Sequence, residues 1–442
     1  MYAFASMRRR ISFLAGRYPR LPIVLLVGLC ALSLGVRAAW LGEPCRAPCR
    51  GAGARLLIFD ERYYVNAART IAGVRPPVGS PYAGAPLGED PNAEHPQLVK
   101  LIIAGSIELF GDGPLAWRLG SLIAGALAIP GMFALVRAAG GGPWPALAAA
   151  ALMAADNLMI VHGRIGTLDI YALAAMVWAG ALYLRGRPLV SGVVIGVGLC
   201  AKLVTGYALI ALVLLELLRW LRERRDPIPA ISRLARCAVP ATGVFIGLLA
   251  AFDQIAPPYD PTTGRLVGGG LFGHIGHMLS YAAQQTSPSG PHGIASYPWG
   301  WLVDYKPIVY LNVNPSSPAP GLYDVHPAVH FLGLISPPIL LLAPPAIALA
   351  GRSVFSGRPE PADELAAVSV AWFAGTFLPF VLLSLILRRT SYLYYMVIVM
   401  PGLYAAVAWL LPRLTRWPKL TLLWAACVIA AAMVAYPFTP LP

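Results

Sequence analysis

The chain alternates between long apolar runs and short segments that carry most of its arginines. The apolar runs are about 20 residues long, the length that a helix needs to cross the hydrocarbon core of a bilayer. We predict spans at residues 21–41, 115–137, 144–161, 166–185, 188–203, 204–220, 237–256, 328–350, 365–387, 391–412 and 419–437. The pattern predicts an all-α polytopic membrane protein with about 11 transmembrane helices, in a single membrane domain over residues 1–442.

The distribution of basic residues predicts how these helices are oriented. Arg8, Arg9 and Arg10 precede the first apolar run, which is long for a signal peptide and lacks an obvious cleavage site. Other basic residues fall on the same side when the spans are counted: Arg185, Arg187, Arg219, Arg222, Arg224, Arg225, Arg233, Arg236, Arg352, Arg358, Arg413, Arg416 and Lys419. Because cytoplasmic loops are enriched in Lys and Arg, we expect a cytoplasmic N-terminus and a retained first helix.

Two long segments, residues 42–114 and 257–327, then form extracytoplasmic loops. In the first, Tyr64, Ala68 and Ile71 recur at helical spacing. The stretch HPQLVKLIIAGSIELF that follows is apolar but too short to span comfortably, and Lys100 interrupts it. We predict that both stretches are helices lying in the membrane interface.

Composition agrees with a membrane protein and weakens one competing interpretation. The chain is 57% hydrophobic and 12% charged, about half the charged share of a soluble protein. Its net charge of +14 could indicate nucleic-acid binding, but the cations lie in short segments between apolar runs, as the positive-inside rule produces. We therefore predict no nucleic-acid partner.

Cys45 and Cys49 lie in the first extracytoplasmic loop, where an oxidising compartment permits a disulfide bond. The sequence leaves open whether that bond forms. The four remaining cysteines are scattered through apolar runs, where a buried thiol behaves as a small hydrophobic group: Cys30, Cys200, Cys237 and Cys427.

The acidic pair Asp60 and Glu61, in FDERYY, has two interpretations. Both residues precede a predicted helix, where they could serve as the N-cap and as a first-turn acid facing the helix dipole. Alternatively, they do chemistry at the membrane surface. Other polar residues predicted at the same depth favour the second interpretation: Asp156, His162, Arg164, Asp169, Lys202, Arg388 and Arg389.

Cations around an acidic pair at an outer membrane surface favour sugar transfer from a polyprenyl phosphate. The leaving phosphate is a stable anion that needs a cation and not a general acid, so one carboxylate that activates the acceptor hydroxyl is sufficient. Arg388 and Arg389 lie on the outer face against the positive-inside rule, which favours an anionic partner. A single displacement at the anomeric carbon would invert its configuration.

The chain resembles the protein O-mannosyltransferases and their bacterial relatives, the lipid-carrier-dependent glycosyltransferases of the GT-C superfamily. The resemblance rests on collinear segments that cover most of the chain: FDERYY, EHPQLVKLIIAGSIELFGDGPLAWRLGSLIAG, AADNLMIVHGRIGTLD, FGHIGHMLSYAAQQTSPSGPHGIASYPWGWLVDYKPIVY and RRTSYLYYMVIVMPGLY. It implies a GT-C bundle and an inverting transferase that moves a sugar, favouring mannose, to protein Ser or Thr hydroxyls. It also implies metal-independent chemistry with no cofactor beyond the lipid-linked donor.

The resemblance also implies roles for individual residues. Asp60 matches the catalytic base, and Glu61 matches its partner in the acidic pair, which helps to position substrate. Arg164 matches an arginine that contacts the donor phosphate or the acidic pair, and Lys202, Arg388 and Arg389 look like further phosphate contacts. A last set would bind substrate or organise the site: His95, Asp156, Asp169, His292, Trp299 and Trp301. For Asp156 a simple N-cap is an equal alternative, and Trp299 and Trp301 could belong to an aromatic belt.

Departures from the family pattern leave the acceptor open. Gln97 and Leu302 stand where the family often has proline, and the second loop lacks the large insertion of eukaryotic members. We therefore expect an enzyme of the prokaryotic plasma membrane with an extracytoplasmic active site. Related enzymes on this scaffold, such as the aminoarabinose transferases, modify lipids or glycans. A transporter is a weaker alternative, because neither internal repeats nor midplane charges are evident. The sugar, the polyprenyl length and the oligomeric state are not readable from the sequence.

Overall fold

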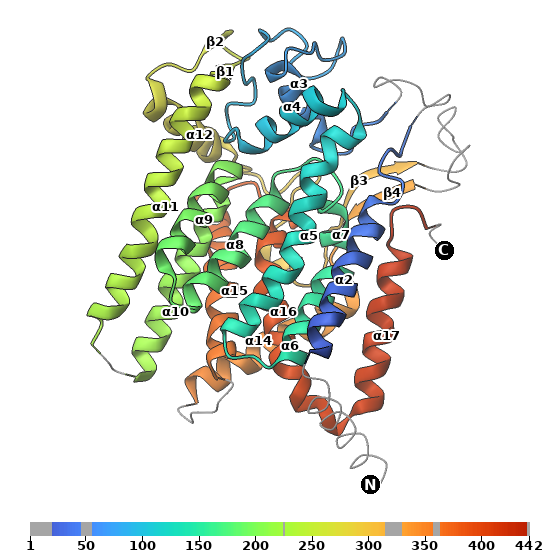
Figure 1. The fold of residues 1–442 in the computed structure, drawn as a ribbon, viewed down its shortest axis with the longest axis vertical. Coiled ribbons are helices and arrows are strands. Elements are labelled where there is room, and N and C mark those ends of the chain that lie inside the picture. Colours follow the sequence, from blue (N-terminus) through green and yellow to red (C-terminus); the bar gives the residue numbers. More distant parts are fainter. Residues whose placement is uncertain (1–19, 46–54, 224–225, 314–328, 357–362, 440–442) are drawn as a thin grey trace.

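The computed structural model describes residues 20–45, 55–223, 226–313, 329–356 and 363–439. Its helices stand side by side in one bundle (Figure 1). Seven helical segments are long and apolar enough to cross a membrane. They are α2 (Leu21–Ala38), α5 (Pro114–Ala138), α10 (Tyr207–Glu223) with the preceding turn η2 (Leu203–Gly206), α11 (Ile228–Ile255), α14 (Pro337–Phe355), α15 (Asp363–Ile386), and α16 (Met396–Leu410) with its flanking turns η3 (Leu393–Tyr395) and η4 (Leu411–Arg416).

Shorter apolar helices fill the remaining predicted intervals. They are α6 (Pro143–Ala155), α8 (Asp169–Leu184), α9 (Pro188–Ala201) and α17 (Pro418–Val434). The described part of the chain thus has an apolar helix in each interval that the hydropathy pattern predicts, but four of them are short for a full crossing. The mostly helical membrane fold is confirmed, and the number of crossings stays a prediction.

Three predicted spans have the wrong boundaries. The helix predicted over 237–256 begins already at Ile228. The span predicted over 144–161 ends at Asp156, where the backbone becomes extended and the Asp156 carboxylate accepts a hydrogen bond from the Leu158 amide to begin α7 (Asn157–His162). The span predicted over 328–350 begins instead with strand β4 (Val329–Gly333), paired antiparallel with β3 (Ile308–Val313). A short apolar run does not distinguish a strand from a helix, and here the helix begins only at the Pro337–Pro338 pair.

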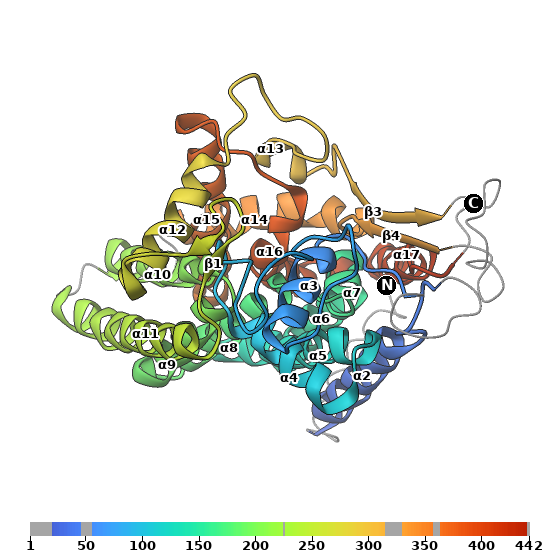
Figure 2. The same cartoon turned by 90° about the horizontal axis from the view of Figure 1, so that it is seen from above.

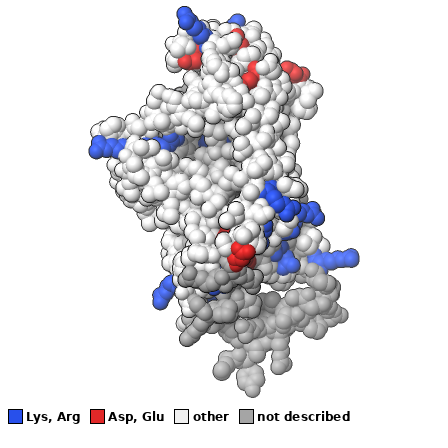
Figure 3. Space-filling model, turned by 90° about the vertical axis from the view of Figure 1, so that its left-hand side faces the viewer, with Lys and Arg blue, Asp and Glu red and all other residues white. Residues whose placement is uncertain are grey.

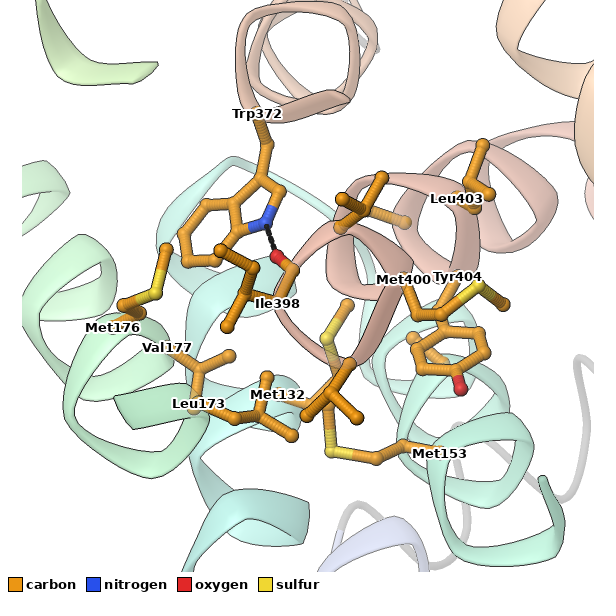
Figure 4. Close-up of a cluster of buried hydrophobic side chains, with 14 of the residues drawn as sticks. Met132, Met153, Leu173, Met176, Val177, Trp372, Ile398, Met400, Leu403 and Tyr404 are labelled. Carbon is orange, nitrogen blue, oxygen red and sulfur yellow. Dashed lines mark hydrogen bonds between the residues drawn. The ribbon is translucent and has the colours of Figure 1, made fainter. Parts of the chain in front are cut away.

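The core is centred on α16, all of whose residues from Met396 to Leu410 are buried. Figure 4 shows its contacts with α15, α8 and α6, where the Trp372 indole donates a hydrogen bond of 2.9 Å to the Ile398 carbonyl. Elsewhere, α9 packs directly on α11 at Gly192, where a Cβ atom would lie 2.1 Å from the Cys237 carbonyl oxygen. Close packing of this kind holds neighbouring membrane helices without a large hydrophobic driving force.

One end of the bundle carries the two long connecting segments (Figures 1 and 2). These segments contain α3 (Glu61–Ile71), α4 (Leu98–Phe110), α12 (Gly270–Gln284), α13 (Pro298–Trp301), and the small ribbon of β1 (Tyr259–Asp260) and β2 (Arg265–Leu266). The helices α3 and α4 form where the sequence predicts them, and their position at a membrane surface stays a prediction. Cys45 is disulfide-bonded; Cys49, its predicted partner, lies outside the described residues.

The two long segments are fastened to each other by Asp90. Its amide donates to the Pro257 carbonyl at 2.9 Å, and its carbonyl accepts from the Tyr259 amide at 2.9 Å. Its carboxylate forms a fully buried ion pair with Lys100, at 2.5 Å. Residues far apart in the sequence are therefore held over the same end of the bundle.

Candidate active site

Asp60 occupies the N-cap position of α3 but does not cap the helix with its side chain. In the described part of the chain its carboxylate has neither a hydrogen bond nor an ion pair, and it is only partly buried. The preceding residue, Phe59, has a positive φ of 53° and stacks on Tyr310 at 4.2 Å between ring centroids. A non-glycine residue in this conformation must be held by its surroundings, so the stacked Phe59 fixes where the Asp60 backbone lies.

Glu61 differs from its neighbour, because its carboxylate is completely buried and fully engaged. It accepts two hydrogen bonds of 2.8 Å from the Arg118 guanidinium, one of 2.7 Å from the Ile58 amide and one of 2.8 Å from the Gly166 amide. Four donors satisfy both oxygens, which leaves no acceptor for a substrate. This geometry disagrees with a catalytic contact by Glu61 and makes it the anchor that holds Asp60 in place.

Lys202 and Asp169 form a second charged group close to Asp60. Their ion pair measures 2.6 Å between the Lys202 Nζ and Asp169 Oδ1 atoms, and both side chains are largely buried. The Lys202 ammonium also lies 5.3 Å from the ring centroid of Tyr394 and 5.5 Å from that of Tyr395. Since Tyr394 in turn packs against Phe59, the ammonium is held on the same side of the bundle as Asp60.

The surroundings raise the pKa of Asp60 to about 6. Burial is the main cause, the charge of Lys202 lowers the pKa, and the charge of Asp169 raises it. A carboxylate tuned in this way is still ionised at neutral pH, and it is more basic than an ordinary aspartate.

His95, which lies in the first long connecting segment, is the fourth polar residue near Asp60, Lys202 and Asp169. Its ring lies between Tyr64 and Tyr281, with centroid separations of 5.8 and 6.1 Å. Burial and the charges of Lys202, Lys100 and Arg389 hold the pKa of His95 well below its usual range, so the imidazole is neutral at pH 7. A neutral imidazole beside a cation can donate or accept a hydrogen bond to a substrate hydroxyl.

The Arg164 side chain is enclosed within the bundle. Its guanidinium donates to the Ala39 carbonyl at 2.7 Å and to the Tyr436 hydroxyl at 3.1 Å, and it lies against the rings of Phe331 and Phe438. It is 2% exposed and forms no ion pair in the described part of the chain. An enclosed guanidinium with these partners packs the bundle, and the donor-phosphate contact stays a prediction.

The other predicted residues divide between structural and surface positions. Asp156 caps α7 and also accepts from the Ser336 amide and the Tyr404 hydroxyl, which makes it a structural residue. Trp301 is buried, donates to the Ser296 hydroxyl and packs against Tyr395. His292 and Trp299 are exposed, as is Arg388, and Arg389 donates to the Ala282 carbonyl.

The sequence interpretation missed residues that build this site. Arg118 lies inside a predicted span, and an arginine within an apolar run is itself a signal of a buried partner. Tyr310, whose hydroxyl lies 2.8 Å from the His162 Nε2 atom, carries no such signal because only the folded chain brings it against Phe59.

Comparisons with known proteins identify relatives of the chain and of its fold. Residues 94–240 match the family described as dolichyl-phosphate-mannose-protein mannosyltransferase. The chain is 26% identical to a polyprenol-phosphate-mannose–protein mannosyltransferase of Corynebacterium glutamicum, over 78% of this chain and 75% of that protein. An enzyme of the same name from Mycolicibacterium smegmatis is 23% identical, over 82% and 78%. The fold matches the Saccharomyces cerevisiae Pmt1–Pmt2 complex bound to its sugar donor with a TM-score of 0.68, at 12% identity, over 94% of this chain and 90% of that chain.

These similarities make the chain a glycosyltransferase whose relatives are protein mannosyltransferases. ArnT from Cupriavidus metallidurans, solved with undecaprenyl phosphate, shares the fold with a TM-score of 0.51 and 19% identity, covering 93% of this chain and 64% of that one. The two chains therefore share a fold. The seven apolar helices and the similarity to these enzymes make the chain an integral membrane protein.

Proposed function

We propose that this glycosyltransferase moves a mannosyl group from a polyprenyl-phosphate donor to Ser or Thr hydroxyls of proteins, with inversion at the anomeric carbon. The observation that carries the proposal is the Asp60 carboxylate, which has no partner in the described residues and lies beside the Lys202–Asp169 pair. An available base and a nearby cation are the two groups that this transfer needs. The names of the relatives support the donor and the acceptor.

In the proposed reaction, the acceptor oxygen attacks the anomeric carbon while Asp60 removes the hydroxyl proton. The bond between that carbon and the phosphate oxygen breaks, and the electron pair leaves with the phosphate. Lys202 then faces the developing negative charge, and Asp169 and the two tyrosine rings hold its ammonium in position. His95 is neutral and can hydrogen-bond the sugar without repelling or attracting the phosphate.

We further propose that the site faces away from the cytoplasm, in the plasma membrane of a prokaryote. The last turn of α10, which carries Arg222, and the start of α11, which carries Arg233, lie at the end of the bundle opposite α3 and α4 (Figure 1). The positive-inside rule assigns the arginine-rich end to the cytoplasm.

Transfer of labelled mannose tests the function directly. Membranes from cells that express the chain are incubated with polyprenyl-phosphate mannose, and protein and lipid fractions are counted separately. We expect label in protein that is released as mannose from Ser or Thr. Label found only in the lipid fraction would support transfer from this donor but show that the acceptor is a lipid. Label no higher than in control membranes would show that polyprenyl-phosphate mannose is not the donor.

The pH dependence of transfer is expected to report the raised pKa of Asp60. Since the base must be ionised to accept a proton, kcat/KM should fall about tenfold for each pH unit below about 6 and level off above it. A profile measured from pH 4.5 to 8 checks this. An acidic limb centred near 4, the value of an ordinary aspartate, would contradict the assignment of Asp60 as the titrating base.

Replacing Lys202 by methionine is expected to weaken use of the donor. A charged hydrogen bond to phosphate contributes about 1.5–3 kcal/mol, so the donor KM should rise roughly 10- to 100-fold. Loss of this positive charge should also move the acidic limb of the pH profile upward, because Lys202 lowers the pKa of Asp60. Lys419→Met, at an exposed position on another helix, is the matched control. A lower kcat with unchanged KM and pH profile would argue against phosphate contact.

A further inference from the structure

Asp253 and His274 form a buried pair, here called the clamp pair, outside the group around Asp60. Asp253 lies in the last turn of α11 and His274 in the second turn of α12, with 2.8 Å between the Asp253 Oδ1 and His274 Nδ1 atoms. The imidazole is completely buried, and the Asp253 side chain is 11% exposed. Figure 3 views the molecule from the side of α10 and α11, and its acidic side chains show mainly near the ends of that face. An acid enclosed within this face must be stabilised by partners inside the protein.

The clamp pair holds the chain on both sides of His95. The His274 Nε2 atom lies 3.0 Å from the carbonyl oxygen of Ala93, two residues before His95. Two residues after it, the Gln97 side-chain amide donates to the Asp253 Oδ1 atom at 2.6 Å. Gln97 stands where the family often has proline, which has no donor for such a bond. The loop that carries His95 is therefore fixed to α11 and α12 by side chains at both of its ends.

Lys100 fixes the same segment from within. Its ammonium pairs with Asp90 and donates to the carbonyls of Asn92 and His95, at 2.5 and 2.8 Å. These bonds close the segment on itself. The clamp pair adds the attachment of the part around His95 to two helices of the bundle.

Hydrogen-bond directions show that a proton lies within the clamp pair. A backbone carbonyl can only accept, so the His274 Nε2 atom that faces Ala93 carries a hydrogen. The Nδ1 atom cannot then face a carboxylate oxygen at 2.8 Å with a lone pair, and so a second proton lies between these two atoms. Whichever atom holds that proton, the clamp pair has no net charge, which lowers the cost of enclosing it.

We propose that the clamp pair positions His95 in the site, with Gln97 as its third member. The His95 ring lies 6.1 Å from the ring of Tyr281, which is also on α12. The helix that carries His274 therefore supplies one of the rings that enclose the imidazole. Asp253 and His274 are positioning residues, because they bind the chain around His95 and not the substrate. The clamp itself is independent of the reaction, whereas its effect on transfer rests on the proposed function.

Amide hydrogen exchange of the full-length protein in detergent, followed by mass spectrometry, tests the clamp without any substrate. His274→Leu removes both hydrogen bonds of the imidazole. We expect peptides that cover residues 90–97 to exchange about tenfold faster than in the wild type, because loss of these bonds makes local opening more frequent. His277→Leu, three residues further along α12, is the matched control and should leave this exchange unchanged. Unchanged exchange in His274→Leu would overturn the clamp.

Asp253→Asn tests whether hydrogen bonds hold the segment, since it can keep them without the second proton. Its amide can donate one hydrogen to the His274 Nδ1 atom and the other to the side-chain oxygen of Gln97, which is buried and has no hydrogen-bond partner in the described residues. This arrangement requires only that the Gln97 amide turns over. We therefore expect slow exchange in Asp253→Asn and fast exchange in Asp253→Leu. Exchange that is the same in both variants would overturn the proposed arrangement.

Transfer kinetics show whether the clamp pair acts through His95. A residue that only positions His95 loses its effect once that imidazole is gone, so the two changes should not add. We expect kcat/KM to fall about tenfold in His274→Leu, as for loss of one hydrogen bond to the sugar, and to be equal in His95→Ala and in the double variant. Additive losses, or full kcat/KM in His274→Leu, would overturn the positioning role. A wild type that transfers nothing would refute the proposed function, and the exchange experiment would then decide on the clamp alone.

Discussion

Replacing Asp60 by asparagine is expected to abolish sugar transfer, with kcat lowered roughly 10²- to 10⁴-fold, the range that a general base contributes. Asparagine has almost the same shape as aspartate but cannot accept the hydroxyl proton. The Asp60 side chain neither caps α3 nor pairs with a cation in the described residues, so the fold loses no contact. The measurement is the initial rate of mannose transfer at saturating donor, with donor binding followed separately.

Donor binding is the readout that separates catalysis from misfolding in this variant. We expect Asp60→Asn to bind the donor at least as well as the wild type, since it removes a negative charge near the phosphate. Asp260→Asn, which changes a largely exposed carboxylate in β1, is the control and should keep full activity. Turnover by Asp60→Asn within a few-fold of the wild type would show that another group accepts the proton.

Replacing Arg118 by methionine is expected to destabilise the protein and to lower its activity together. The guanidinium pairs with Glu61 and also donates to the carbonyls of Leu41, Glu43 and Leu56. Removing it leaves a buried carboxylate without its cation, and breaking a buried pair on one side costs about 3–5 kcal/mol. Thermal unfolding in detergent should therefore begin at a clearly lower temperature.

The expected loss of activity in Arg118→Met follows from the position of Glu61. Because Asp60 directly precedes this anchor, release of Glu61 displaces the base, and a shift of about 1 Å can lower a rate roughly 100-fold. Arg137→Met, on the same helix, removes one hydrogen bond to the Gly141 carbonyl and is the matched control. If the variant unfolds at a lower temperature but keeps its kcat when assayed well below that temperature, Arg118 contributes to stability and not to catalysis. Unchanged stability would contradict the buried-pair argument.

The hydropathy pattern predicted most of the helices because a membrane helix satisfies its own backbone and needs only a long apolar surface. The prediction failed for β4, where the apolar residues Val329, Phe331 and Leu332 pair with β3 and so form a strand. Nothing in so short a run distinguishes the two structures. The choice depends on the partner strand, which lies elsewhere in the sequence.

The candidate site was predicted unevenly for a related reason. Asp60, Lys202, Asp169 and His95 were all named from the sequence, and the structure brings them into one group. Glu61 and Arg164 were named with them but are engaged elsewhere, by Arg118 in one case and by an aromatic enclosure in the other. Both the residues near Asp60 and the residues engaged elsewhere are ionisable and are predicted at the same membrane depth. The sequence therefore could not separate them.

By itself, the sequence determined that this chain is a largely helical membrane protein and which intervals hold most of its apolar helices. These properties depend on local composition and on the cost of placing polar groups in hydrocarbon. Only the tertiary structure decided that Asp60 is the available carboxylate while Glu61 is its anchor, because that difference depends on donors from Arg118 and Gly166. The availability of a charged group is set by the partners that folding brings to it, and those partners are distant in the sequence.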